Sequence, residues 1–297
     1  MNDRAKFSDP HMDSLLPAVK FDRRGFLASG ISTGFALAAG PVMAQTAIHT
    51  PADGLEAADI TVPVPGGNMP SYYAAPDKPG KYPVVIVVPE VFGLHEYQKD
   101  ICRRLARLGY FGITQDPFFR EGELAKISDM QQVMAGANKL DDATMLADLD
   151  ALVDYIGKQP KANPAKMGIT GMCRGGRTVW MYLSHSKSIK TGVAWYGGLT
   201  AAPPVITATP FDIVDQLNAP VLGLYGGADA GMPIEMIERM QAALKASPDQ
   251  SAKKSTIHIY PGMPHAFHAD YRPSYRKEAA EDGWKRMLAW FKQHGVA

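Results

Sequence analysis

The chain has 297 residues, 46% of them hydrophobic, which is enough for one sizeable core. Its 31 basic and 30 acidic side chains give a formal net charge of +1. This balance argues against a basic surface for nucleic acid. The composition is therefore typical of a globular protein that acts on small molecules, and we expect no nucleic-acid partner.

The first part of the chain resembles an export signal. Arg23-Arg24-Gly25-Phe26-Leu27 precedes an apolar run rich in small residues, and small residues continue to Ala44. This pattern resembles a twin-arginine signal, which the twin-arginine export machinery reads on proteins that fold before export. An uncleaved membrane anchor is the alternative, although the apolar run is short for a span. We expect a cleaved signal over residues 1–44, one domain over 45–297, a periplasmic location and no stable membrane association after cleavage.

Predicted strands alternate with predicted helices along the rest of the chain. The predicted strands cover 59–64, 71–75, 83–88, 110–114, 166–170, 192–195, 220–225 and 255–260. The predicted helices cover 97–108, 141–158, 178–184, 233–245 and 275–294. Residues 118–140 have weak periodicity and are expected to form a loop or partial lid. This alternation predicts an α/β fold with a mostly parallel central sheet, helices on both faces, and ligand chemistry at the carboxyl ends of the strands.

The most informative segment is Gly171-Met172-Cys173-Arg174-Gly175-Gly176, which lies between a predicted strand and a predicted helix. Glycines on both sides of a reactive side chain are typical of a nucleophile elbow, a tight and strained turn from strand to helix. The residue at the corner is Cys173, where most such enzymes use serine. The sequence therefore predicts attack by a thiolate on an activated carbonyl group.

A thiol needs a base to become a strong nucleophile. His265 lies in a loop rich in proline and glycine after the last predicted strand, and Asp229 follows a glycine pair after the preceding strand. His268 is the nearest alternative for the base. The order nucleophile, acid and histidine is the chain order of α/β-hydrolases. We therefore predict a triad of Cys173, His265 and Asp229.

Backbone N–H groups should stabilise the tetrahedral oxyanion that this attack creates. One donor is expected from Arg174, the residue after the nucleophile, and the other from Val91 in the loop after the third strand. This chemistry requires no metal and no organic cofactor.

The chain after Asp59 resembles the dienelactone hydrolase family, the carboxymethylenebutenolidases. The resemblance lies in four motifs: Pro89-Glu90-Val91-Phe92-Gly93, Gly171-Met172-Cys173-Arg174-Gly175-Gly176, Gly226-Gly227-Ala228-Asp229 and Tyr260-Pro261-Gly262-Met263-Pro264-His265-Ala266-Phe267. It implies the α/β-hydrolase fold and the same triad. It also implies that Glu90 contacts the thiol in the resting enzyme and shifts when substrate arrives.

The resemblance further implies residues that bind substrate. Arg120 matches an arginine that grips the substrate's carboxylate, and Tyr196 resembles a pocket residue. A second arginine is expected four residues after the histidine, but this chain has Ala269 there and Arg272 nearby. Because of this departure, two substrate classes stay open: dienelactone-like lactones or esters that carry a carboxylate, and neutral esters.

The favoured function is hydrolysis of small activated lactones or esters through a thioester acyl-enzyme. The alternative from another class is a non-catalytic or thiol-redox protein that pairs Cys173 with Cys102 in a disulfide. Cys102 lies beside Ile101 in a predicted helix, where a cysteine usually packs as a small hydrophobic residue. This position favours the hydrolase.

Overall fold

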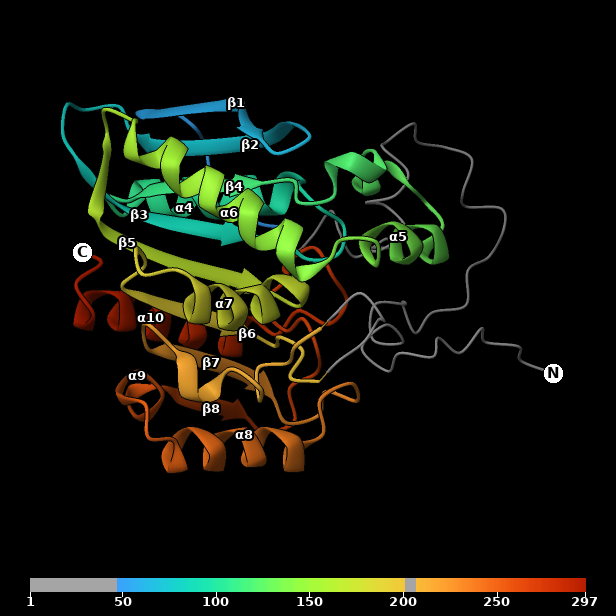
Figure 1. The fold of residues 1–297 in the computed structure, drawn as a ribbon. Helices are drawn as coiled ribbons and strands as arrows, with labels where there is room; N and C mark the ends of the chain where they lie inside the picture. The colour runs from blue at the N-terminus through green and yellow to red at the C-terminus, as the bar shows by residue number, and fades with distance from the viewer. Residues whose placement is uncertain (1–46, 201–206) are drawn as a thin grey trace.

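The computed structural model describes residues 47–200 and 207–297, and the expected export signal lies outside these ranges. Within them, an 8-stranded sheet has the order β1-β2-β4-β3-β5-β6-β7-β8 (Figure 1). The strands are β1 Leu55–Val64, β2 Gly67–Pro76, β3 Tyr82–Val88, β4 Phe111–Gln115, β5 Ala162–Met172, β6 Thr191–Trp195, β7 Val221–Gly226 and β8 Thr256–Tyr260. The pairs β1–β2 and β2–β4 are antiparallel, and every other pair is parallel. The predicted α/β class and mostly parallel sheet are confirmed.

Helices pack on both faces of this sheet. The α-helices of the described ranges are α4 Glu96–Arg107, α5 Met130–Ala137, α6 Asp142–Gly157, α7 Arg174–His185, α8 Ile234–Ala246, α9 Gln250–Lys254 and α10 Lys277–Gln293. In Figure 1, α6, α7 and α8 lie in front of the sheet, and α4 and α10 lie behind it. This is the layered arrangement of the α/β-hydrolase fold.

The third strand shows how the core is divided between the two faces. Val84 and Ile86 pack in one buried cluster with residues of α6, α7 and α8. Val85 and Val87 pack in a second buried cluster with residues of α4 and α10. Since successive side chains point to opposite faces, a strand covered on both sides must be apolar throughout. This explains why the β-branched run was recognisable as a central strand.

The structure has more helix than the sequence predicted in two segments. The helix after the elbow begins at Arg174 and not at Thr178, because the glycines that lower helix propensity belong to its first turn. Residues 118–140 are not a plain loop. They contain two short 3₁₀ turns and α5, and the side chain of Asp129 caps α5 by accepting the Gln131 N–H at 2.8 Å.

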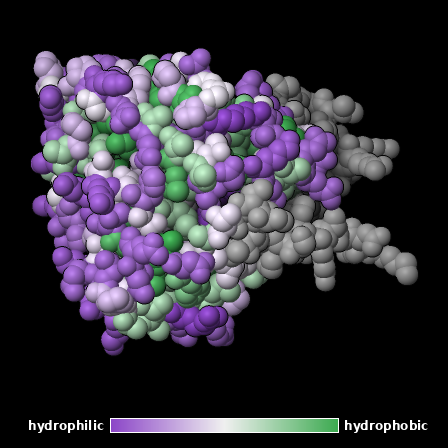
Figure 2. Space-filling model, in the orientation of Figure 1, coloured by the Kyte–Doolittle hydropathy of each residue, from purple (hydrophilic) through white to green (hydrophobic). Residues whose placement is uncertain are grey.

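The surface visible in Figure 2 is mostly hydrophilic, with apolar residues in scattered groups. Among the described residues the large hydrophobic side chains that are exposed are Ile48, Leu108 and Ile234. No helix in the described ranges has the length and apolar character needed to cross a membrane.

Candidate active site

Cys173 occupies the corner between β5 and α7. Its backbone has φ 55° and ψ −117°, and its side chain is buried. A positive φ is strained for a residue that carries a side chain, and such strain is concentrated at functional sites. The structure therefore gives Cys173 the backbone conformation expected at a nucleophile elbow.

The glycines around Cys173 allow three segments of backbone to meet. A Cβ atom on Gly171 would lie 2.2 Å from the carbonyl oxygen of Gly175. A Cβ on Gly175 would lie 2.3 Å from the oxygen of Val88, and one on Gly176 would lie 2.5 Å from that of Trp195. No real Cβ atom approaches backbone so closely. The small residues are thus required for the elbow to pack against the ends of β3 and β6.

Asp229 and His265 form a buried pair in the loops after β7 and β8. Oδ2 of Asp229 lies 2.6 Å from Nδ1 of His265, and each side chain is 1% exposed. The other carboxylate oxygen accepts the Gly231 N–H at 2.9 Å, which fixes the orientation of the carboxylate. The carboxylate can therefore hold one tautomer and one orientation of the imidazole ring.

The charge state of His265 depends on both of its neighbours. Burial alone would lower the pKa of His265, but the Asp229 carboxylate and the Cys173 sulfur outweigh it and raise this pKa to about 10. The structure thus brings together the three predicted triad residues from the ends of β5, β7 and β8. It favours a charged imidazole on His265 beside the sulfur of Cys173.

His268, the alternative base, has a different environment. Its Nδ1 is hydrogen-bonded to the hydroxyl of Tyr97, and its ring centroid lies 4.3 Å from that of Trp195. Burial, and next the charge of Arg104, lower the pKa of His268 to about 3. A buried histidine held neutral behind the site is a packing residue, so the carboxylate pairing favours His265 as the base.

Glu90 lies in the loop after β3 and is fully buried. Within the described residues its Oε2 accepts a hydrogen bond from the Tyr271 hydroxyl, and its Oε1 lies 3.9 Å from Nη1 of Arg272. These contacts go to Tyr271 and Arg272 rather than to the thiol. The contact between Glu90 and Cys173 therefore stays a prediction.

Several buried polar atoms near the triad lack a hydrogen-bond partner among the described residues. They are Oε1 of Glu90, the hydroxyl of Tyr196, and Nη1 and Nη2 of Arg272. Tyr196 has φ 39°, and its ring centroid lies 5.0 Å from that of His265. Burial and then Glu90 raise the pKa of Tyr196 well above its usual value, so its hydroxyl keeps its proton. Since buried polar groups are normally bonded, this cluster can receive a polar ligand.

Arg120 is not brought to this cluster. Its guanidinium donates to both carboxylate oxygens of Asp148 in α6, at 2.7 and 2.8 Å, and to the carbonyl oxygen of Pro65 at 2.6 Å. It also lies 4.4 Å from the ring centroid of Phe119. The arginine that the motif match assigned to the substrate thus holds two parts of the fold together. Ala269 is fully buried.

The two expected oxyanion donors lie at the same corner of the fold. Arg174 is the first residue of α7, so its N–H has no acceptor inside the helix. Val91 follows the two carbonyl groups, of Val88 and Pro89, against which Gly175 packs. The role of these two N–H groups stays a prediction that the packing makes feasible.

The remaining features concern the alternative functions. Cys102 and Cys173 are both free, and the Cys102 backbone packs against Gly112 of β4. Burial raises the pKa of the Cys102 thiol, which keeps it inert. In the described ranges, no group of three or more His, Cys, Asp or Glu side chains is arranged to hold a metal ion.

The chain is similar to a known protein family, to individual relatives and to a solved structure. The model of the dienelactone hydrolase family matches residues 69–295. A "Putative carboxymethylenebutenolidase" of Methylorubrum extorquens is 45% identical over 291 residues, which cover 97% of this chain and 99% of that protein. A "Probable 2-oxo-3-(5-oxofuran-2-ylidene)propanoate lactonase" of Bradyrhizobium sp. is 31% identical over 234 residues, covering 77% of this chain and 91% of that protein. The crystal structure of a "Putative Dienelactone Hydrolase" from Klebsiella pneumoniae has a TM-score of 0.76 and 42% identity, and covers 80% of this chain and 99% of that one.

Proposed function

The chain belongs to the dienelactone hydrolase family and is a hydrolase of esters or lactones, and from this premise we propose that Cys173, His265 and Asp229 are its catalytic triad. One observation carries the proposal. His265 is bonded to Asp229 and has a pKa raised by both Asp229 and Cys173, although burial alone would lower it. This is the arrangement that a thiolate nucleophile and its imidazolium partner need.

In the proposed cycle the Cys173 thiolate attacks the carbonyl carbon, a C–S bond forms, and the carbonyl electrons move to oxygen. The oxyanion accepts hydrogen bonds from the N–H groups of Arg174 and Val91. Its collapse breaks the C–O bond of the lactone or ester, and the leaving oxygen takes the proton of the His265 imidazolium. The product is a thioester on Cys173.

Water then completes the cycle. Neutral His265 accepts a proton from the attacking water, and a second tetrahedral oxyanion forms. Collapse of this intermediate breaks the C–S bond and releases the carboxylic acid product. The thiolate and the imidazolium are restored, so each turnover consumes one ester or lactone and one water molecule.

For the substrate we propose a small activated lactone or ester that carries a carboxylate. The support is the buried guanidinium of Arg272, whose Nη1 and Nη2 have no hydrogen-bond partner in the described part of the chain. The Bradyrhizobium relative is named for a lactone that is also a propanoate. An incoming carboxylate would compete with Glu90 for Arg272, and the Tyr196 hydroxyl could donate a further hydrogen bond.

Neutral esters are a second candidate substrate class, and the contacts of Arg120 support it. Because this side chain is committed to Asp148 and Pro65, and Ala269 replaces the other expected arginine, carboxylate recognition would depend on Arg272 alone. A pocket with one arginine tolerates neutral esters better than a pocket with two.

Replacement of the nucleophile tests the triad. Cys173→Ala should lower the hydrolysis of an activated aryl ester and of a dienelactone by at least about 10³-fold, as expected when a covalent nucleophile is lost. Cys102→Ala is the matched control and should retain activity, because Cys102 is a packing residue. Hydrolysis of both substrates by Cys173→Ala at the wild-type rate would exclude the proposed triad.

Export is proposed from the sequence alone. The support is the segment Arg23-Arg24-Gly25-Phe26-Leu27 with its apolar continuation, which resembles a twin-arginine signal. Replacement of both arginines by lysine should retain the precursor in the cytoplasm, whereas the natural sequence should yield a periplasmic protein that begins after Ala44. Periplasmic accumulation of the double lysine variant would contradict this export route.

A further inference from the structure

The segment between β4 and α6 is anchored to the residue that follows the nucleophile. We call residues 118–140 the cap segment; it contains α5 and extends beyond the carboxyl ends of the strands (Figure 1). The guanidinium of Arg174 donates to the carbonyl oxygen of Leu140 at 2.8 Å and lies 6.0 Å from the ring centroid of Phe118. One side chain thus contacts both ends of the cap segment.

The cap segment is tied together near the same two ends. Nζ of Lys139 lies 2.5 Å from a carboxylate oxygen of Glu121, so the outgoing and returning chains are paired. Inside the segment, a Cβ on Gly136 would lie 2.8 Å from a methyl group of Leu124, so its two halves pack closely. A compact segment with paired ends can keep or change its position as a unit.

The positive charge of Arg174 is unfavourable at this position. It begins α7, where the helix dipole disfavours a positive charge. Burial, and next the charge of Arg177, lower the pKa of Arg174 to about 10. The nearby carboxylate of Asp142 is bonded on both oxygens by Arg177, at 2.7 and 2.9 Å, while the hydrogen bond that Arg174 donates goes to a backbone carbonyl. Among the described residues, this half-buried cation therefore has a backbone carbonyl and an aromatic ring as its partners, and these contacts indicate its role.

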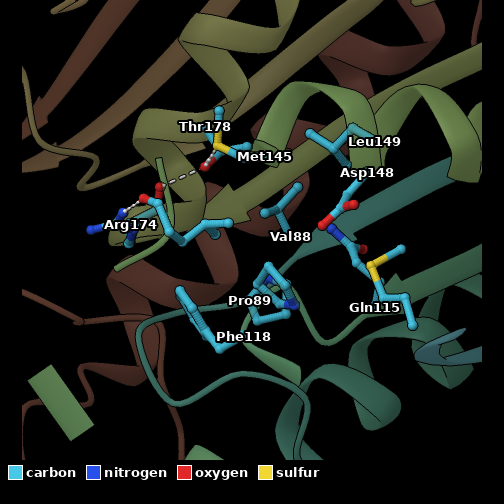
Figure 3. Close-up of a pocket in the computed structure, with 12 residues that line it drawn as sticks. Val88, Pro89, Gln115, Phe118, Met145, Asp148, Leu149, Arg174 and Thr178 are labelled. Carbon is cyan, nitrogen blue, oxygen red and sulfur yellow. Dashed lines mark hydrogen bonds between the residues drawn. The ribbon is translucent and has the colours of Figure 1, made fainter. Parts of the chain in front are cut away.

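A small cavity lies at the base of the cap segment. A cavity of about 10 Å³, roughly the room of one water molecule, lies between α7 and the cap segment. Figure 3 shows Arg174, Phe118 and Pro89 around this cavity, and Leu140 also lines it. Phe118 and Leu140 are buried in the core, and the Arg174 contacts add to this apolar packing a polar link between the cap segment and the elbow.

We propose that the side chain of Arg174 is a positioning residue that couples the cap segment to the oxyanion hole. It holds both ends of the cap segment on the residue whose own N–H faces the reacting oxygen, so displacement of the segment displaces that N–H. The inference rests on the proposed function of the elbow. It assigns to Arg174 a second role, through its side chain, beside that of its backbone.

The test compares Arg174→Met, Arg174→Lys and the control Lys187→Met. Methionine keeps an unbranched apolar stem but removes the charge and the donors, and lysine keeps the charge and N–H donors on a single nitrogen. Lys187 is exposed after α7, so its replacement also removes one positive charge without touching the cap segment. The readouts are amide hydrogen exchange over residues 118–140, and kcat and KM for an activated ester.

In the Arg174→Met variant, amide hydrogens of the cap segment should exchange about tenfold faster than in the wild type, as expected for the loss of a charge-assisted hydrogen bond. Exchange elsewhere should be unchanged. Its kcat should fall by about tenfold with a smaller change in KM, because the displaced N–H acts in the transition state. Arg174→Lys should restore most of the wild-type protection from exchange and most of the wild-type kcat. Lys187→Met should behave as the wild type.

Three results would overturn the proposal: unchanged exchange in the cap segment, faster exchange throughout the protein, or faster exchange in the cap segment with an unchanged kcat. Arg174→Lys provides the comparison if Arg174→Met does not fold. The exchange measurement needs no substrate. If the wild-type protein hydrolysed no ester, the proposed function would fail while the positioning of the cap segment was still decided.

Discussion

Asp229 and His265 are held 2.6 Å apart, Oδ2 to Nδ1, by loops that follow two neighbouring parallel strands. Neither loop alone defines the pair. Leu222 to Gly226 of β7 pair with Thr256 to Tyr260 of β8, and this register brings both loops to the same edge of the sheet. The contact between Asp229 and His265 therefore depends on the pairing of β7 with β8.

Removal of the Asp229 charge should impair catalysis more than folding. Asp229→Asn can still contact the imidazole, but it no longer stabilises the charged ring or selects its tautomer, so kcat should fall by roughly 10²–10⁴-fold. Asp154→Asn, at an exposed position of α6, is the matched control. Steady-state kinetics with thermal unfolding curves would check this, and a kcat within a factor of two of the control would contradict it.

Arg272 should determine the preference for anionic substrates. Arg272→Gln removes the buried cation, so the ratio of kcat/KM for an ester with a carboxylate to that for a matched neutral ester should fall by about tenfold. Arg120→Gln should leave this ratio unchanged, because Arg120 is bonded to Asp148 and Pro65. The reverse pattern, with only the Arg120 variant altered, would return carboxylate binding to Arg120.

The elbow should not tolerate a side chain at Gly171. Gly171→Ala places a Cβ 2.2 Å from the oxygen of Gly175, so the corner must open, and we expect loss of activity with destabilisation of several kcal/mol. Gly157→Ala at the end of α6 meets no atom within 4 Å and should change the free energy of unfolding by less than about 1 kcal/mol. Urea unfolding of both variants checks the contrast, and equal effects would exclude the steric account.

His268 should contribute to acid sensitivity. Its folded pKa is lowered from 6.5 to about 3, mainly by burial, so the folded protein excludes a proton that the unfolded chain binds. This group therefore favours unfolding progressively as the pH falls from about 6.5 toward 3. Between pH 6 and 4.5, His268→Gln should lose up to about 1.4 kcal/mol per pH unit from the slope of the unfolding free energy. Parallel slopes for the variant and the wild type would contradict this.

The strands, and the proximity of the residues proposed as the triad, were predictable because their signals are local or ordered along the chain. The run of β-branched residues in β3 predicts a strand that is buried on both faces, as the structure confirms. The structure also brings together Cys173, Asp229 and His265, which their places after predicted strands and their order along the chain selected from among eight histidines and many more carboxylates.

Other features had no local signal. Tyr271 is hydrogen-bonded to Glu90 across 181 positions of sequence, and only its place next to Arg272 pointed to it. Arg120 matched a family motif, but its partner Asp148 lies 28 residues further on, in another helix. A motif match identifies a residue type at a position, whereas its charge partner is selected by tertiary packing.

Because of the position of β8, we expect hydrolytic activity to require the complete sheet. This strand is at one edge, it pairs with β7 within the sheet, and the proposed base follows it directly in the chain. A nascent chain that has not yet added β8 carries the thiol without its base. Reactivity toward esters would thus appear only after β8 has docked, and recovery of hydrolysis after denaturation would time the addition of this strand.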